Sequence, residues 1–112
     1  MSHDLLEKSL SNKVKSDINM IVNFFNNYKK GDFIYPSVLK RSLDIDDKET
    51  YKILSILEKA KLLKINYEYF CYSCNSSSKL YEYYSELVES YTCEICEDSL
   101  TLDNVKVVYK VI

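Results

Sequence analysis

The chain has 112 residues, 46% of them hydrophobic, a formal net charge of −2 at pH 7, one glycine and one proline. This length allows one compact domain or two very small ones, and the composition contains no flexible linker. No run approaches the ~18 consecutive apolar residues of a membrane span. Residues 1–15 lack the apolar stretch of a signal peptide. We therefore expect a cytoplasmic, reducing location and no membrane partner.

The charge is divided unevenly along the chain. Residues 1–65 contain 12 Lys and Arg against 9 Asp and Glu, whereas residues 66–112 contain 3 against 8. An anionic second half repels a nucleic-acid backbone at close approach. Any nucleic-acid contact is therefore expected to come from the first half.

The first half contains three segments with helical features. Apolar residues recur at steps of three and four from Val14 to Tyr28, which predicts an amphipathic helix. A short second helix fits Pro36 to Leu43, because proline suits a first helical turn. Asp46 or Asp47 is a suitable N-cap for a third helix that continues to about Lys61.

The second half is predicted to form strands. Leu62 to Tyr72 alternates partly and is rich in Leu, Ile, Tyr and Phe, as is typical of a strand. Leu80 to Tyr84 and Leu87 to Thr92 fit a hairpin, but their glutamates also suit a short helix, so both interpretations stay open. Val105 to Ile112 predicts a last strand that pairs back onto the first one. The whole pattern indicates an α+β fold.

All four cysteines lie in the second half, as Cys71-x-x-Cys74 (the first knuckle) and Cys93-x-x-Cys96 (the second knuckle), with 18 residues between them. Each knuckle can aim two sulfurs at one ion, and two knuckles complete a tetrahedron with bonds of about 2.3 Å. Thiols stay reduced inside cells, which favours metal binding over disulfides. We predict one structural Zn²⁺ per chain; iron in a rubredoxin-like site is the alternative. Four protein ligands leave no open position, which argues against zinc catalysis.

The sequence gives no support to an enzyme. His3 is the only histidine, which argues against a Ser-His-Asp or Cys-His site, and there is no glycine-rich phosphate loop. We therefore expect no catalytic residues, no bound organic cofactor and no small-molecule substrate.

The order helix, short helix, turn, helix, strand, with the run from Ile53 to Ile65, resembles a winged helix-turn-helix. Joined to a four-cysteine ribbon, this architecture is similar to archaeal transcription factor E and its eukaryotic counterpart. It is also similar to short accessory proteins of prokaryotic multi-component systems. The resemblance implies a three-helix winged helix-turn-helix over residues 1–68. It further implies a β zinc ribbon over residues 69–112 that extends from the wing, with residues 105–112 pairing with the wing strand.

The chain departs from this family pattern at three positions. Family members often have glycine where this chain has Lys61, at the expected end of the third helix. Their knuckles favour glycine after the second cysteine, where this chain has Asn75 and Glu97. Asparagine tolerates a left-handed backbone more readily than glutamate does.

The expected recognition helix has poor chemistry for reading DNA. Its N-terminal end is rich in carboxylates, and residues 46–60 contain no Asn, Gln or Arg for paired base contacts. Phosphates could still be contacted by basic side chains. The candidates are Lys40, Arg41, Lys52, Lys59 and Lys64.

Tyrosine accounts for 11 of the 112 residues. Tyrosines are common at interfaces, although the same rings could simply cover a thin core. The candidate partner surface comprises Tyr81, Tyr83, Tyr84 and Glu86. We favour a non-catalytic, zinc-binding adaptor or regulatory subunit that docks protein partners in a larger prokaryotic assembly. The alternative is a DNA-binding winged-helix transcriptional regulator.

Overall fold

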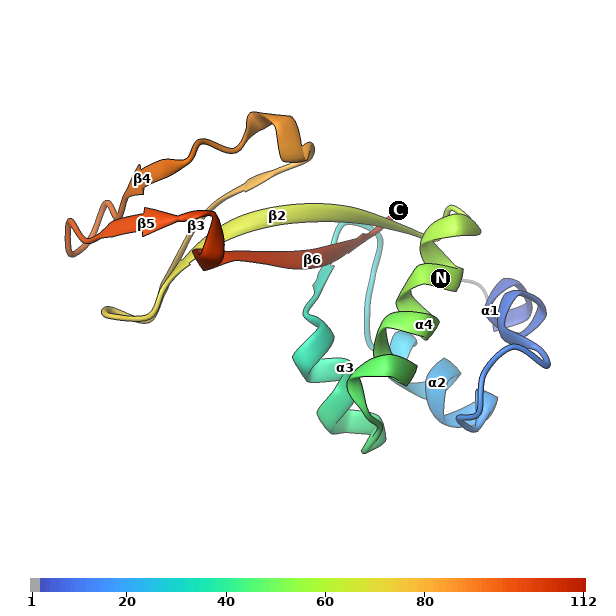
Figure 1. The fold of residues 1–112 in the computed structure, drawn as a ribbon. Coiled ribbons are helices and arrows are strands. Elements are labelled where there is room, and N and C mark those ends of the chain that lie inside the picture. The colour runs from blue at the N-terminus through green and yellow to red at the C-terminus, as the bar shows by residue number, and fades with distance from the viewer. Residues whose placement is uncertain (1–2) are drawn as a thin grey trace. The chain divides into compact units, whose positions relative to one another are not determined.

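The computed structural model describes residues 3–112, except for the side chains of His3, Ser78 and Lys79. Over these residues the fold is α+β, with four α-helices and two antiparallel sheets (Figure 1), which confirms the predicted class. The chain divides into two compact units. Unit 1 comprises the residues up to Lys64 together with Tyr109–Ile112, and unit 2 comprises Ile65–Val108. Among the described residues, no helix has both the length and the apolar character needed to cross a membrane.

Unit 1 contains an N-terminal helix that the sequence analysis did not predict. This helix, α1, spans His3–Leu10, so the predicted count of three helices is wrong. Leu6 and Leu10 lie one turn apart on its inner face, and both are fully buried. Leu5 is half-exposed and the other residues around them are polar, so a stretch this short gives no clear periodic signal to distinguish a helix from a frayed end.

The predicted long helix from Val14 to Tyr28 is shorter in the structure. Helix α2 spans Ile18–Phe25 and begins after Asp17, whose side chain accepts a hydrogen bond from the Asn19 N–H at 2.8 Å. This N-cap satisfies one of the first backbone donors and fixes the start of the helix. The apolar stripe was therefore predicted in the correct place, but the capping aspartate was missed.

Helices α3 (Pro36–Leu43) and α4 (Asp47–Lys59) begin where the sequence predicted. Proline occupies the first turn of α3, which fixes the backbone angle there. The Asp46 side chain accepts a hydrogen bond from the Glu49 N–H at 2.8 Å and caps α4. Beyond α4 the chain turns at Lys61, which has a left-handed φ of 62°.

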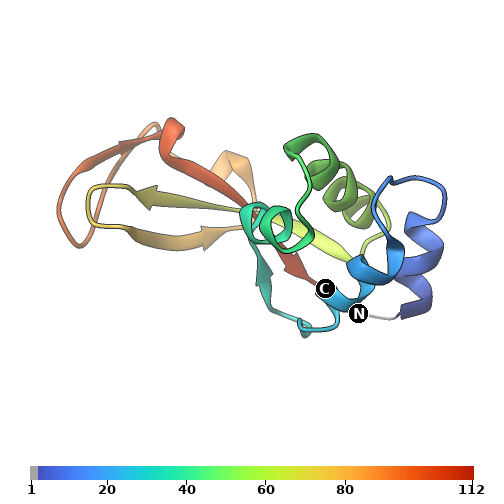
Figure 2. The ribbon, with the colours of Figure 1, turned by 90° about the horizontal axis from the view of Figure 1, so that it is seen from below.

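The larger sheet has the strand order β1-β6-β2-β3. Its strands are β1 (Phe33–Ile34), β6 (Val105–Val111), β2 (Leu63–Cys71) and β3 (Ser76–Tyr81). Strands β2 and β3 run side by side in opposite directions (Figure 2). The smaller sheet pairs β4 (Ser90–Thr92) with β5 (Ser99–Thr101). Two 3₁₀ turns complete the secondary structure, at Tyr84–Glu86 and Leu102–Asn104.

The predicted hairpin between Leu80–Tyr84 and Leu87–Thr92 is wrong. Strand β3 pairs with β2, and β4 pairs with β5, so that each knuckle closes its own hairpin. The alternative short helix over the same residues is reduced to the 3₁₀ turn at Tyr84–Glu86. Alternation of side chains indicates a strand but does not identify its partner, because any apolar neighbour satisfies the same pattern.

Unit 1 contains a buried carboxylate, Glu49, in the first turn of α4, with 8% of its surface exposed. Its Oε2 accepts hydrogen bonds from the Lys15 N–H (2.8 Å), the Ser16 N–H (2.8 Å) and the Ser16 hydroxyl (2.9 Å). Burial alone would raise the pKa of Glu49, but the hydrogen bonds from Ser16 and Lys15, with the nearby Lys52 charge, lower it below its usual value. Glu49 therefore connects the segment between α1 and α2 to α4.

Replacing Glu49 by Ala should remove the acceptor for these three donors and destabilise unit 1 by about 2 kcal/mol at pH 7. Because the folded pKa lies below the unfolded value, this contribution is fully present above about pH 4.3 and is lost as the pH falls through the folded pKa. Urea unfolding followed by far-ultraviolet circular dichroism at pH 7 and at lower pH would measure it.

The matched control is Asp47→Asn. Asp47 is an exposed acid in the same helical turn, and its carboxylate forms an ion pair with Lys40 at 3.0 Å. Exposed ion pairs contribute little, so this variant should lose much less stability. Equal losses for the two variants would contradict the role assigned to Glu49.

Candidate metal centre

Each knuckle is a tight turn between two paired strands. The first knuckle lies between β2, which ends at Cys71, and β3, which begins at Ser76. In the second knuckle the Cys93 N–H donates to the Asp98 carbonyl at 2.8 Å, and the Glu97 N–H donates to the Cys93 carbonyl at 2.9 Å. These backbone bonds bring the two cysteines of the second knuckle onto one side of the turn.

The residue after each second cysteine adopts the left-handed backbone that glycine usually supplies. Asn75 has a φ of 56° and Glu97 a φ of 64°. For a residue with a side chain this conformation costs about 1–2 kcal/mol. The knuckle geometry is therefore kept at both positions without glycine, and the cost is greater at Glu97 than at Asn75.

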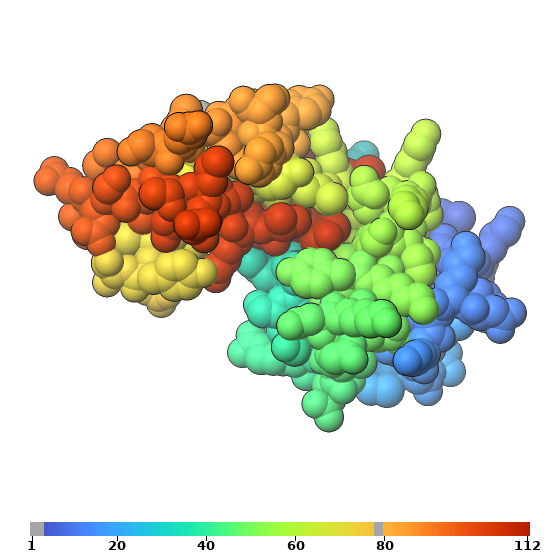
Figure 3. Space-filling model, in the orientation of Figure 1, coloured from blue at the N-terminus to red at the C-terminus, as the bar shows by residue number. Residues whose placement is uncertain are grey.

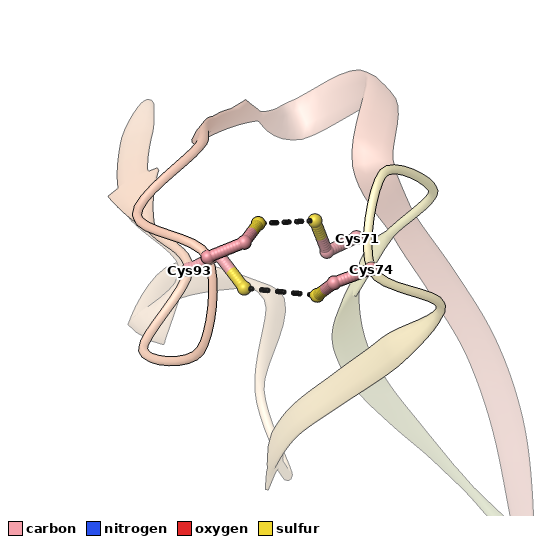
Figure 4. Close-up of side chains that lie close together, drawn as sticks. Cys71, Cys74 and Cys93 are labelled. Atoms are coloured by element: carbon pink, nitrogen blue, oxygen red, sulfur yellow. Dashed lines mark hydrogen bonds between the residues drawn. The ribbon is translucent and has the colours of Figure 1, made fainter.

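The four sulfurs converge from the two facing knuckles. All four Sγ atoms lie within 4.8 Å of one another, with 3.4 Å between Cys71 and Cys96 and 3.5 Å between Cys74 and Cys93. Figure 4 shows Cys71 and Cys74 on one loop and Cys93 on the facing loop, with their sulfurs directed at one another. These distances are too long for disulfides and close to the ~3.8 Å expected between sulfurs of a tetrahedral site with 2.3 Å bonds. The four cysteines could therefore hold one metal ion.

The cysteines are also part of the core of unit 2. Cys71 and Cys93 are buried and pack with Tyr69 and Leu100. The rings of Tyr69 and Tyr91 stack with their centroids 4.7 Å apart. The side chains that pack partly buried against this group are Cys74, Tyr81, Leu87, Tyr91 and Val105. The candidate ligands and the hydrophobic core of this unit are thus the same cluster.

The electrostatics of the cluster favour a cation among the sulfurs. The Cys96 and Ile95 backbone N–H groups donate to the Cys93 sulfur and lower the pKa of this thiol to about 6. The Asp98 N–H lowers the pKa of Cys96, but the neighbouring thiols, Cys71 foremost, and burial outweigh this effect and raise it to about 12. Four sulfurs this close cannot all be thiolates unless a positive charge lies between them.

Ser76, the first residue of β3, lies beside the sulfurs, and the sequence analysis did not single it out. Its hydroxyl oxygen lies 2.9 Å from the Cys74 sulfur and 3.8 Å from the Cys93 sulfur. Hydroxyl donors to ligating atoms orient them and moderate their charge. The only feature of the sequence that could have indicated this position is that Ser76 follows Cys74 by two residues.

The predicted phosphate contacts lie in unit 1 or at its boundary, and they are distributed over three elements. They are Lys40 and Arg41 in α3, Lys52 and Lys59 in α4, and Lys64 in β2. Lys40 is engaged with Asp47, as described above. A surface pocket of about 370 Å³ at the start of α4 includes Lys15, Lys48 and Lys52, but also the carboxylates of Asp46 and Glu49. This mixed charge weakens the attraction for a polyanion.

The predicted partner residues separate into one inward and three outward side chains. Tyr81 is half-buried and packs edge-on against Tyr69, with 6.2 Å between ring centroids. Tyr83 and Tyr84 are 59% and 57% exposed, and Glu86 is also exposed. The orange segment that follows residue 80 lies at the surface in the space-filling view (Figure 3). Tyr81 therefore belongs to the core, whereas the other three are accessible.

Comparisons of the chain with protein-family models, curated protein sequences and solved structures find no match.

Chelating a metal ion held by the four cysteines should unfold unit 2 and leave the helices of unit 1 in place. A structural zinc site contributes on the order of 10 kcal/mol in small peptides, which exceeds the stability that a unit of this size can obtain from packing. We expect chelation to collapse the amide signals of Ile65–Val108 in a two-dimensional NMR spectrum and zinc to restore them. In a Cys93→Ser variant zinc should restore nothing. Dispersed unit 2 signals at zero metal content would contradict this prediction.

Replacing Glu97 by Gly should strengthen metal binding about fivefold, because glycine adopts the left-handed backbone about 1 kcal/mol more cheaply. Glu97→Ala is the matched control: it removes the same charge but keeps the side-chain carbon that makes this backbone unfavourable. Competition against a chromophoric chelator would measure both variants. An equal gain for alanine would assign the effect to charge instead of backbone strain.

Proposed function

We propose that this protein is a non-catalytic adaptor or regulatory subunit. In this proposal unit 1 is a winged helix-turn-helix, unit 2 is a four-cysteine zinc ribbon, and the ribbon docks a protein partner. The observation that carries the proposal is the exposure of Tyr83 and Tyr84 on a segment whose two ends are anchored in the cysteine core.

The order of elements in unit 1 supports the winged-helix assignment. Helix α2, the short strand β1, α3 and α4 are followed by β2, and β6 lies between β1 and β2 in the sheet. Strand β2 leads out of unit 1 into the first knuckle, and β6 returns to it from unit 2. The ribbon thus occupies the place in the chain where a wing turn would stand.

Four sulfur ligands would leave no open coordination position on the ion, which supports zinc as the metal and a structural role for it. Zinc favours tetrahedral thiolate sites and needs no open coordination position for this purpose. The residues that would hold it are Cys71, Cys74, Cys93 and Cys96. When bound, it would fix both knuckles to one point and neutralise part of the charge of the four thiolates.

Charge favours a protein partner over nucleic acid for unit 2. This unit has two lysines against eight acidic residues, whereas unit 1, with residues 109–112 included, has 13 basic residues against nine acidic ones. The alternative, a DNA-binding regulator, draws its support from the positive charge of unit 1. In that unit, however, the Asp46 carboxylate caps the start of α4 by accepting a hydrogen bond from the Glu49 N–H. The helix end that would approach DNA therefore carries a negative charge, which disfavours contact with phosphates.

Site-specific photo-crosslinking in the native cell tests the two functions. A photoreactive phenylalanine analogue replaces Tyr84 in unit 2 or, as the matched control, Tyr51, which is 49% exposed on α4. We expect position 84 to form a stoichiometric protein adduct that survives nuclease treatment and position 51 to form none. Nucleic-acid adducts at position 51, with no protein adduct at position 84, would overturn the adaptor function in favour of the DNA-binding one.

A further inference from the structure

Residues 82–89, which we name the tyrosine loop, connect β3 to β4 and are fixed to the core of unit 2. Tyr81 before the loop, Tyr91 after it and Leu87 within it pack against the cysteine cluster. The Tyr69 hydroxyl also donates a hydrogen bond to the Val88 carbonyl. The loop has no regular strand pairing, yet it is held at both ends and in the middle.

The side chains between these anchors point outward. Tyr83, Tyr84 and Val88 are 59%, 57% and 52% exposed. A 3₁₀ turn orders the tyrosines: the Tyr83 N–H donates to the Glu86 carboxylate at 3.0 Å, and the Glu86 N–H donates to the Tyr83 carbonyl at 3.1 Å. One edge contact supports the Tyr84 ring, at 5.6 Å from the Tyr67 ring. Pre-ordered aromatic side chains lose little entropy on binding, which suits them to recognition.

The tyrosine loop lies within a purely acidic stretch of sequence. From Leu80 to Val105 the chain contains seven acidic residues and no Lys or Arg. All seven are exposed: Glu82, Glu86, Glu89, Glu94, Glu97, Asp98 and Asp103. Four thiolates around a divalent ion would add two further negative charges. This field attracts a cationic partner and repels a polyanion.

The combination of exposed rings and carboxylates fits guanidinium groups best. A guanidinium stacks on an aromatic face and pairs with a carboxylate through two parallel hydrogen bonds, whereas an ammonium is a strongly hydrated point charge. Aromatic rings of unit 2 already attract a cation, since the Lys106 ammonium lies 3.9 Å from the centre of the Phe70 ring; this contact supports a cationic ligand in general. A second copy of this chain cannot supply the ligand, because Arg41 is its single arginine.

We propose that the tyrosine loop binds an arginine-rich segment of a protein partner. The proposal rests on the adaptor function proposed above and names the chemistry of its partner. Tyr83 and Tyr84 stack on guanidinium groups, and Glu86 and Glu89 pair with them. Binding of the segment requires a metal ion at the cysteines, because the side chains that hold the loop (Tyr81, Leu87 and Tyr91) pack on the cysteine cluster.

Titration of the zinc-loaded full chain with synthetic peptides tests this directly. The probes are a peptide with alternating arginine and serine and its lysine-for-arginine counterpart, at physiological salt, followed by NMR and fluorescence anisotropy. We expect the arginine peptide to bind at least about fivefold tighter than the lysine peptide, with shifts concentrated in residues 82–89. The Tyr83→Ala/Tyr84→Ala double variant should weaken binding about tenfold or more, and the Tyr51→Ala control should not.

A second variant covers the case in which the tyrosine variant fails to fold. Glu86→Gln/Glu89→Gln keeps side-chain size and the acceptor for the Tyr83 N–H, and it should weaken arginine-peptide binding about fivefold and reduce its salt dependence. Glu58→Gln, on α4 of unit 1, is the matched control. Metal content and spectral dispersion verify the fold of every variant.

Equal affinity for the two peptides, shifts outside the tyrosine loop or absence of binding would each overturn this proposal. These results would leave the adaptor function standing if the crosslink at position 84 still captures a protein. Absence of that crosslink, together with nucleic-acid adducts at position 51, is the separate result that removes the adaptor function itself.

Discussion

The convergence of four sulfurs is the interaction on which unit 2 depends. Cys71 and Cys93 are two of the four buried residues of its cysteine cluster, and the other two, Tyr69 and Leu100, pack with them. Without a cation these sulfurs cannot all ionise, as the opposed pKa shifts of Cys93 and Cys96 indicate. Filling the cluster with a divalent metal would resolve that conflict and join the two knuckles. Metal binding at the four cysteines would therefore be thermodynamically coupled to the folding of this unit.

The cysteine cluster also constrains the backbone after each knuckle and the tyrosine loop between the knuckles. A left-handed residue must follow each knuckle, and the chain accepts this conformation at Asn75 and even at Glu97. The same cluster positions residues 82–89, because Tyr81 and Leu87 pack on it from within the polypeptide that connects the knuckles. The cysteine cluster thus helps to determine where Tyr83 and Tyr84 lie, through the anchoring side chains of Tyr81 and Leu87.

The sequence predicted two helix starts and the clustered cysteines correctly, but it did not predict the strand partner of β3 or which tyrosine and glutamate side chains are buried. Spacing alone identified the four cysteines that come together, and capping rules found the starts of α3 and α4 at Pro36 and Asp46. The burial of Tyr81 against Tyr69 and the acceptor role of Glu49 depend on residues farther away along the chain. The hairpin of β2 and β3 is local, but side-chain alternation did not identify β2 as the partner of β3. A glutamate in a first helical turn has the same local pattern whether it faces water or two backbone donors.

The carboxylates described in the two units have different roles, and this difference supports the proposal that unit 2 binds the partner. In unit 1, Asp46 and Glu49 accept hydrogen bonds from the backbone and hold the start of α4, so their charge serves the fold. In unit 2, the Glu86 carboxylate accepts a local hydrogen bond from the Tyr83 N–H and remains exposed, and Glu89 is also exposed. Exposed acids next to ordered aromatic rings contribute little to stability and much to the selection of a cationic partner. The cationic partner that we propose would therefore be bound by exposed carboxylates of the tyrosine loop, whose contribution to the stability of the fold is small.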